Sequence, residues 1–397
     1  MRTLLIADAY APLRTSCAVQ MRDLARGLVE QGHEVTVLVP GAAAGKRWTL
    51  ESNDGVQVLR VRSFGTKDLG YLRRTLAEMS LPFMMWRGLR RSPLAATKWQ
   101  AIVWYSPSIF LGPLVSALRR AAGCRSYLVL RDIFPEWAVD MGVLRRGAAY
   151  RFFKIVERFQ YSVADVIGVQ SPSNLKYLEA WATRSGRRLE VLHNWLGAAP
   201  VSAASLSVAR TPLAGRTICV YAGNMGVAQG MDILLELATQ MRNRHDVGFL
   251  FVGRGSEASR LREQARIRRL DNAMFFDEIE PCEIPALLAQ CHVGILALDP
   301  RHRTHNVPGK FLAYMQAGLP VLARVNAGND LTSLIESEYV GRVYVGDSAD
   351  DLRVLAEELC ADRAQRALMS VNARRLADSA FSVGSAVQQI STAVYGT

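Results

Sequence analysis

Short runs of β-branched and aromatic residues alternate with amphipathic segments along the first half of the chain. Residues 3–8 have the composition of a strand, and residues 18–31 place apolar side chains at helical spacing until Gly32 ends the pattern. Together with the run 34–39 they predict a strand–helix–strand unit. Further strands are predicted at 55–62, which alternates as an exposed strand does, and at 102–104, 126–130, 166–169 and 189–192.

The second half repeats this alternation. Between the halves, residues 197–212 are rich in Gly, Ala, Pro and Ser and have no periodicity, which predicts a linker. Strands separated by helices form parallel sheets with right-handed crossovers, so the pattern predicts two α/β units. The predicted strands are 218–222, 248–252, 274–276, 294–298, 320–323 and 341–345, and helices are predicted at 231–243, 256–268, 285–290 and 310–316.

A glycine-rich loop opens the second unit. It follows the predicted strand 218–222 and reads Gly-Asn-Met-Gly-Val-Ala-Gln-Gly over residues 223–230, and a helical pattern begins directly after it. Such a loop directs backbone N–H groups and the positive end of a helix dipole toward one place, which suits a phosphate. The alternative is a tight turn that only needs glycine torsions.

A second motif places a lysine at the start of a helix. Pro308 and Gly309 break the chain, so Lys310 lies in the first turn of the predicted helix. A cation is unfavourable there against the helix dipole unless an anion lies beside it. Lys310 is therefore a candidate partner for the phosphate, and the alternative is an ordinary surface lysine.

Three motifs together resemble family 4 of the retaining glycosyltransferases, which have the GT-B fold. They are Gln-Gly-His-Glu-Val-Thr-Val at 31–37, the glycine-rich loop, and Asn-Val-Pro-Gly-Lys-Phe-Leu-x-Tyr-Met-x-x-Gly-x-Pro-Val at 306–321. The resemblance covers nearly the whole chain. The subgroup to which the chain is most similar is the bacterial O-antigen and lipopolysaccharide transferases that act on deoxy-amino sugars such as N-acetyl-L-fucosamine.

The resemblance implies an α/β protein of two doubly wound, Rossmann-like domains that face each other across a cleft. An acceptor-binding domain would span residues 1–197, a linker 198–212 and a nucleotide-sugar donor domain 213–375, and a C-terminal helix in 376–397 would pack back on the first domain. The donor-binding residues that it implies are Gly223, Asn224, Met225, Gly226, Gln229, Arg254, Phe276, Ile279, His305, Pro308, Gly309 and Lys310.

The phosphate loop departs from the family pattern. Many relatives have an arginine and a lysine where this chain has Asn224 and Gln229. Lys310 and the helix N-termini would then offset more of the phosphate charge. Additional cations are available at Arg254, Arg301 and Arg303.

A second departure concerns a pair of glutamates spaced eight apart in many relatives, which correspond here to His305 and Ala313. The second glutamate bonds the donor ribose, and an alanine side chain cannot, so a neighbour or the backbone must replace it. His305 would contact the donor sugar or phosphate; the alternative is an ordinary histidine of a surface loop.

In the first half, polar residues follow the predicted strand 126–130, where side chains face the ligand crevice of such sheets. Asp132 is the candidate for orienting the sugar or the acceptor hydroxyl, since a carboxylate stabilises an oxocarbenium-like transition state. Arg131 and Lys310 complete the predicted catalytic set. The alternative is a structural ion pair between Arg131 and Asp132. Glu136, Thr15 and Ser16 are predicted on the acceptor side.

The positive charge lies in the first half. Residues 1–200 contain 28 Lys and Arg against 15 Asp and Glu, and the rest of the chain contains 20 against 21. This asymmetry indicates an anionic partner, which would be a nucleic acid, an acidic membrane surface or an acidic substrate. Residues 71–91 combine arginines with Leu, Met, Phe and Trp, as a helix that lies on anionic lipid does; the alternative is a domain helix with solvated arginines.

The remaining composition is that of a cytoplasmic protein. Its six cysteines form no C-x-x-C pair, and they are interpreted as buried thiols in a reducing compartment. The first residues fit a strand better than a signal peptide, and no apolar stretch is long enough to span a membrane. We expect a location on the inner face of the cytoplasmic membrane, and no cofactor or metal, because the chain has no Asp-x-Asp motif.

These observations predict a retaining glycosyltransferase. It would move a sugar, an N-acetylated deoxyhexosamine, from a UDP-sugar donor to a lipid-linked or lipopolysaccharide glycan acceptor. One alternative is a UDP-sugar 2-epimerase, which shares the architecture. Another is a basic nucleic-acid-binding protein, although the sequence has no helix-turn-helix, zinc or RNA-binding signature.

Overall fold

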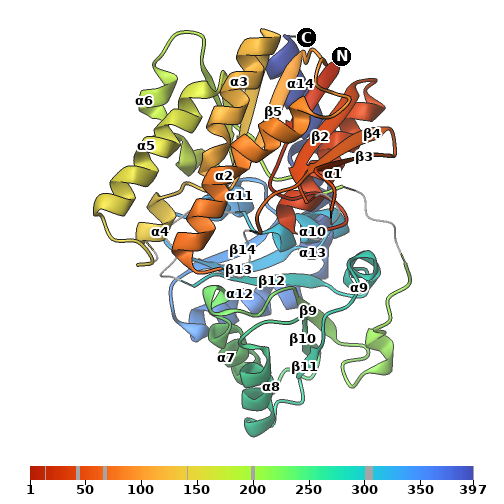
Figure 1. Cartoon of the computed structure of the whole chain (residues 1–397). Helices are drawn as coiled ribbons and strands as arrows, with labels where there is room; N and C mark the ends of the chain where they lie inside the picture. The colour runs from red at the N-terminus through yellow and green to blue at the C-terminus, as the bar shows by residue number, and fades with distance from the viewer. Residues whose placement is uncertain are drawn as a thin grey trace. The chain divides into compact units, whose positions relative to one another are not determined.

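The computed structural model describes residues 1–13, 15–41, 45–65, 69–140, 142–197, 202–299 and 307–396. The chain divides into two compact units (Figure 1). Unit 1 contains residues 1–197 together with 383–397, and unit 2 contains residues 198–382. Each unit is an α/β structure built on its own sheet, which confirms the predicted fold class.

Unit 1 is built on an eight-stranded sheet in the order β3-β4-β2-β1-β5-β6-β7-β8. All its pairings are parallel except that of β3 with β4. The prediction missed β3, and it was wrong about 55–62 as an exposed strand, because β4 pairs on both sides and is mostly buried. The strands are β1 Arg2–Ile6, β2 Glu34–Pro40, β3 Trp48–Asn53, β4 Val56–Val61, β5 Ala101–Ser106, β6 Arg125–Leu130, β7 Val166–Val169 and β8 Arg188–Val191.

Helices cover both faces of this sheet (Figure 1). On one face α1 (Ser16–Glu30) packs with α14 (Val383–Tyr395), whose Gln389 amide donates to Glu190 and to the Val191 carbonyl at β8. The other face carries α2 Tyr71–Arg90, α3 Gly112–Ala122 and α5 Ala148–Val163, with the shorter η1 Ile109–Leu111, α4 Glu136–Asp140, η2 Pro172–Tyr177 and α6 Glu179–Ala182 at its margins.

Unit 2 has a six-stranded, fully parallel sheet in the order β11-β10-β9-β12-β13-β14. Its strands are β9 Thr217–Ala222, β10 Val247–Val252, β11 Ala273–Phe276, β12 Val293–Ala297, β13 Val321–Val325 and β14 Gly341–Val345. The helical segments are η3 Val208–Arg210, η4 Val227–Gln229, α7 Asp232–Gln240, α8 Ala258–Ile267, η5 Pro281–Glu283, α9 Ile284–Leu288, α10 Gly309–Ala317, α11 Asp330–Ser337, α12 Ala349–Ala361 and α13 Arg363–Ala380.

The strand orders determine where a ligand can bind. In unit 1 the chain leaves β1 toward β2 and later returns on its other side at β5, and in unit 2 it leaves β9 toward β10 and returns at β12. Loops that leave two such neighbouring strands diverge to opposite faces, which opens a crevice at the carboxyl ends of the strands. The glycine-rich loop follows β9, and the segment that leads to Lys310 follows β12.

Candidate functional site

Backbone contacts join the ends of three neighbouring strands in unit 2. The Gly223 N–H donates to the Val252 carbonyl over 2.9 Å, and the Gly253 N–H donates to the Phe276 carbonyl over 3.1 Å. Gly253 has a φ of +148°, and a Cβ there would lie 2.0 Å from the Gly223 oxygen. The glycine at 253 is therefore required for the loops after β9 and β10 to approach so closely.

The glycine-rich loop is held by its own side chains. Gln229 Oε1 accepts from the Gly226 N–H over 2.9 Å and from Asn224 Nδ2 over 3.2 Å. The two residues that replace the family's cations thus bond to each other. Met225 is buried, and its N–H donates to the Arg254 carbonyl over 2.7 Å. Among the residues that the structure describes, the Asn224 N–H has no acceptor, so it is available to a ligand.

Lys310 lies beside this loop. Its half-buried ammonium donates to the Tyr221 hydroxyl and lies 3.7 Å from the centroid of that ring, and its Cε is 3.3 Å from the position of a Cβ on Gly223. No carboxylate of the described ranges pairs with it. Burial lowers the pKa of Lys310 to about 7. An anion at this place would favour the charged ammonium.

Tyr314 positions Lys310 from one turn further along α10. The buried Tyr314 hydroxyl accepts from the Ala222 N–H and donates to the Val220 carbonyl, both over 3.1 Å. Its ring lies over Gly294 of β12, where a Cβ would come within 2.5 Å of the ring. Helix α10 is thereby fixed across β9 and β12, and its N-terminus faces the glycine-rich loop. In the described chain the N–H groups of Gly309 and Lys310 have no acceptor, as the first turn of a helix requires.

The other predicted donor contacts are less direct. The Pro308 backbone precedes α10 as its N-cap, and Phe276 contributes its carbonyl to Gly253. The Arg254 guanidinium is 80% exposed and pairs with Glu278 over 3.0 Å, so it is already engaged. Ile279 is half-buried beyond β11. His305, Arg301 and Arg303 lie outside the described residues.

In unit 1, Arg131 follows β6 and is buried. Its Nη1 donates to the Leu192 carbonyl over 2.6 Å and its Nη2 to the His193 carbonyl over 3.3 Å, and the guanidinium stacks on the Trp195 ring at 5.0 Å. Burial lowers the pKa of Arg131. The alternative of an ion pair with Asp132 is wrong, because this guanidinium binds main-chain carbonyls instead. Arg131 therefore holds the segment after β8 through Nη1 and Nη2, and among the described residues its buried Nε has no hydrogen-bond partner.

The Asp132 carboxylate forms no ion pair with any of the described residues. Burial raises its pKa; the Arg131 charge opposes that shift and the Asp8 charge adds to it. Asp8 follows β1 and accepts from the Cys17 thiol over 3.3 Å. Tyr105 of β5, between these two strands, donates to Gln20 over 3.0 Å. Asp8 and Tyr105 thus join Asp132 at the crevice of unit 1.

The three predicted acceptor-side residues differ in availability. Thr15 and Ser16 are exposed at the start of α1, where Thr15 Oγ1 accepts from the Ala18 N–H over 3.4 Å as a helix cap. Glu136 accepts from the Tyr150 hydroxyl and pairs with Lys154, both over 3.0 Å. Glu136 is therefore part of an internal polar network, which argues against the predicted contact with an acceptor.

The described ranges contain no group of three or more His, Cys, Asp and Glu side chains that would hold a metal ion. None of their helices combines the length and the hydropathy that crossing a membrane demands. The six cysteines carry no disulfide. Cys17, Cys219, Cys291 and Cys360 are buried as predicted, whereas the prediction is wrong for the half-buried Cys124 and Cys282.

Comparison with known proteins defines the class. Residues 16–195 match the family model described as Glycosyl transferase 4-like domain, and residues 216–362 match the model described as Glycosyl transferases group 1. These two segments, which make up most of the two α/β units, are glycosyltransferase-family domains. The protein therefore has the GT-B architecture, with a parallel α/β sheet in each domain.

Individual relatives agree with this class. The probable glycosyltransferase WbjE of Pseudomonas aeruginosa is 27% identical over 61% of this chain, a match that spans 62% of WbjE, less than two thirds of its length. The putative colanic acid biosynthesis glycosyl transferase WcaI of Escherichia coli K12 is 24% identical over 85% of this chain and 86% of WcaI. The crystal structure of HepE from Anabaena in complex with UDP superposes with a TM-score of 0.68 at 16% identity, covering all of both chains.

Proposed function

We propose that this protein transfers a sugar from a UDP-sugar to a lipid-linked or lipopolysaccharide glycan. The observation that carries the proposal is the half-buried Lys310 ammonium, which has no carboxylate partner in the described chain and lies between the glycine-rich loop and the N-terminus of α10. Lysine and free helix N–H groups are standard ligands of phosphate. The names of WbjE and WcaI, both glycosyltransferases, support the same reaction class and give the epimerase alternative no support.

The donor diphosphate would bind in unit 2. Lys310 would pair with it, and the N–H groups of Asn224, Gly309 and Lys310 would donate to its oxygens. Because Asn224 and Gln229 are neutral and bonded to each other, the loop contributes dipoles and no charge. The donor that we favour is a UDP-linked N-acetylated deoxyhexosamine, and the complex of HepE with UDP supports the choice of nucleotide.

The sugar would be transferred with retention at its anomeric carbon and without a metal. The acceptor hydroxyl oxygen replaces the UDP oxygen at that carbon, the hydroxyl proton passes to the leaving diphosphate, and that diphosphate is stabilised by Lys310 and the helix N-terminus. Asp132 would orient the sugar or the acceptor hydroxyl from unit 1. Burial raises the pKa of Asp132, and the nearby Asp8 charge adds to this shift.

Helix α2 would attach unit 1 to an anionic membrane. Leu72, Leu76, Met79 and Phe83 follow one another at intervals of four, three and four residues, which places them in one stripe. Leu72 is 75%, Leu76 59% and Phe83 65% exposed, whereas the opposite side of the helix buries Leu81, Met85 and Leu89 in the core.

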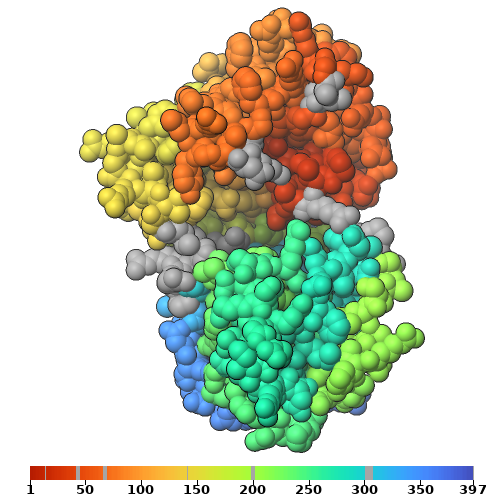
Figure 2. Space-filling model, turned by 60° about the horizontal axis from the view of Figure 1, so that its bottom comes forward, coloured from red at the N-terminus to blue at the C-terminus, as the bar shows by residue number. Residues whose placement is uncertain are grey.

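Helix α5 adds a second exposed apolar stripe, formed by Phe152, Ile155 and Phe159. Both helices contact the short η1 segment and pack in the same core cluster, so they lie on the same face of the unit 1 sheet (Figure 2, α2 in orange and α5 in yellow). The arginines at 73, 74, 87, 90, 151 and 158 flank the two stripes. Apolar stripes bordered by arginine suit the interface of a bilayer with anionic headgroups. A lipid-linked acceptor would be reached there, on the inner face of the cytoplasmic membrane.

Calorimetry with UDP tests the donor site. Lys310→Ala should weaken UDP binding by roughly tenfold or more, because a charge-assisted contact is lost. Lys176→Ala is the matched control, since Lys176 also lies over a tyrosine ring, that of Tyr177 at 5.3 Å, but in unit 1. Equal UDP affinity in the two variants would reject the site. The reaction is tested with a UDP-sugar that the protein binds, and NMR identifies the anomeric configuration of the product. An inverted configuration would reject retention.

A further inference from the structure

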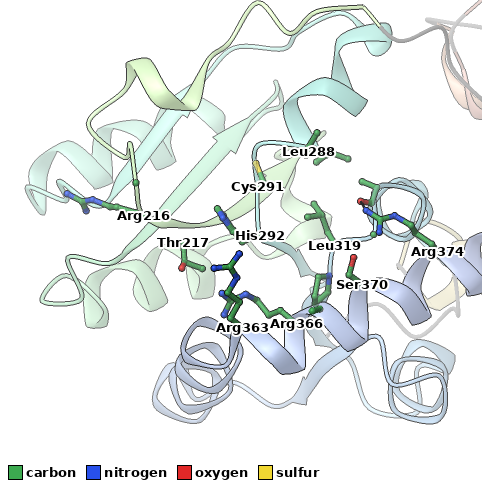
Figure 3. Close-up of a pocket in the computed structure, with 16 residues that line it drawn as sticks. Arg216, Thr217, Leu288, Cys291, His292, Leu319, Arg363, Arg366, Ser370 and Arg374 are labelled. Carbon is green, nitrogen blue, oxygen red and sulfur yellow. Dashed lines mark hydrogen bonds between the residues drawn. The ribbon is translucent and has the colours of Figure 1, made fainter.

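A basic pocket lies at the amino-terminal ends of strands in the unit 2 sheet. It has a volume of about 670 Å³ and is lined by the chain where β9, β12 and β13 begin, at Thr217, His292 and Pro320 (Figure 3). Lys310 and the glycine-rich loop lie at the carboxyl ends of the strands. The pocket is therefore separate from the proposed diphosphate site and does not depend on the proposed function.

The lining of this pocket is basic and contains no carboxylate. Its charged side chains are four arginines, Arg216, Arg363, Arg366 and Arg374, and the imidazole of His292 lies among them. Arg363 and Arg366 are one turn apart on α13 and extend toward Thr217 and His292, whereas Arg216 points away from this group (Figure 3). A phosphate placed between Arg363, Arg366 and His292 would meet donors from two sides.

The charges of this group are not neutralised within the described chain. Arg363 has no hydrogen bond or ion pair there. Arg366 donates only to the carbonyls of Leu359 and Cys360, over 2.6 Å each. Main-chain carbonyls carry partial charges, so the guanidinium keeps most of its field. An anion would relieve the repulsion between the two arginines.

His292 is prepared to donate to that anion. Its Nδ1 accepts from the Ile218 N–H over 3.0 Å, so the proton of the neutral ring is on Nε2. Burial lowers the pKa of His292, and the charges of Arg366 and Arg363 lower it further. This lowered pKa is consistent with the place of the imidazole in the same pocket as the two guanidinium groups.

We propose that this pocket binds a small organic phosphate. Arginine pairs recognise phosphate by bidentate hydrogen bonds, and the hydroxyls of Thr217 and Ser370 add neutral donors. The volume is within the range of small-molecule sites and exceeds the space of one phosphate group. Leu288, Leu319 and Pro320 line the same cavity and would contact the carbon skeleton of the ligand.

NMR of the full chain tests the proposal. The probe is inorganic pyrophosphate, and the readout is the imidazole Cε1–H signal of His292, assigned with His292→Gln. We expect a saturable shift of this signal. Arg363→Gln should weaken the binding by roughly tenfold or more, whereas Arg242→Gln should not change it. Arg242 is an exposed arginine of the same unit whose guanidinium bonds only to the Thr239 carbonyl.

Three results would overturn the proposal. The first is a His292 signal that stays unmoved by millimolar pyrophosphate. The second is an equal loss of affinity in Arg363→Gln and Arg242→Gln, which would indicate unspecific attraction to a basic unit. The third is disappearance of the shift in Lys310→Ala, which would place the anion at the carboxyl ends of the strands. Arg363 is exposed and its side chain makes no internal bond, so its replacement should leave the protein folded. Thermal unfolding of each variant checks this.

Discussion

The Lys310 ammonium lies 3.7 Å from the centroid of the Tyr221 ring and donates to the Tyr221 hydroxyl. That hydroxyl in turn donates to the Asn224 carbonyl over 2.5 Å. One tyrosine at the end of β9 thus connects the cation of α10 with the glycine-rich loop. The ring face and the hydroxyl oxygen hold the charge in place without neutralising it, so the ammonium is available to an anion.

Lys310 should lower the stability of the protein without its ligand. Burial lowers the pKa of Lys310 to about 7. Below pH 7 the folded protein therefore holds a buried ammonium, which water solvates better in the unfolded chain, and this favours unfolding. We expect Lys310→Met to raise the midpoint of thermal unfolding at pH 6.5 by roughly 2–4 °C. The difference from wild type should shrink as the pH rises above 7, because the wild-type ammonium loses its proton. Scanning calorimetry with Lys176→Met as control checks this, and a lower midpoint for Lys310→Met would contradict it.

UDP binding should depend on pH through the same group. Above pH 7 the ligand-free lysine loses its proton, so UDP must bind a minor protonated form. The affinity for UDP is then expected to fall between pH 7.5 and 9 by up to about tenfold per unit. Lys310→Arg keeps its charge across this range and should show a flat profile. Parallel profiles for the two proteins, measured by calorimetry, would show that Lys310 does not titrate in this range.

Asp132 should affect turnover without affecting the donor nucleotide. Asp132→Asn keeps the shape of the side chain and removes the carboxylate charge near the reacting sugar. We expect the release of UDP from a bound UDP-sugar to slow by roughly a hundredfold or more, with the affinity for UDP unchanged. Asp140→Asn is the control, because Asp140 is exposed on α4. Loss of UDP affinity in Asp132→Asn would assign the residue a structural role.

The stripe on α2 should determine membrane binding. Leu76→Glu places a charge at a position that is 59% exposed, so the core is untouched. Sedimentation with vesicles of phosphatidylglycerol and phosphatidylcholine should fall by roughly tenfold, because the apolar side chain no longer enters the bilayer. Ile267→Glu is matched in exposure, at 59%, but lies in unit 2. Equal binding of both variants would refute the docking surface.

Replacing the arginines at 73, 74, 90 and 91 separates lipid from other partners. If the surface binds anionic lipid, this variant and high salt should both release the protein from the vesicles. Undiminished sedimentation after both changes would contradict the proposed contact of these arginines with anionic headgroups.

Gly253 should tolerate no side chain. A Cβ at this residue would lie 2.0 Å from the Gly223 oxygen, and its φ of +148° is strained for any other residue. Gly253→Ala should therefore lower the unfolding midpoint by roughly 4–10 °C and weaken UDP binding, because the loops after β9 and β10 must separate. Gly147→Ala, where a Cβ would meet nothing within 4 Å, is the control. A normal midpoint for Gly253→Ala would contradict this packing.

The alternation of apolar runs and amphipathic segments was sufficient to predict two parallel α/β units, because side-chain periodicity is a local property. It identified β7 and β14 with their observed bounds. It missed β3, whose sequence WTLESN is mostly polar and becomes a strand only by antiparallel pairing with β4. The motifs also placed Lys310 in the first turn of a helix, where it lies.

Contacts between distant segments were decided by the tertiary structure alone. The sequence does not show that Lys310 donates to the Tyr221 hydroxyl or that Asn224 donates to Gln229. It also does not show that Arg131 donates to the Leu192 carbonyl. Nor does it bring Arg363 and Arg366 to the His292 imidazole across the unit 2 sheet. Local pattern specifies which elements form and which face they bury. The partner of each buried polar group depends on strand order and crossover, which bring together residues far apart in the sequence, such as Tyr221 and Lys310, 89 positions apart.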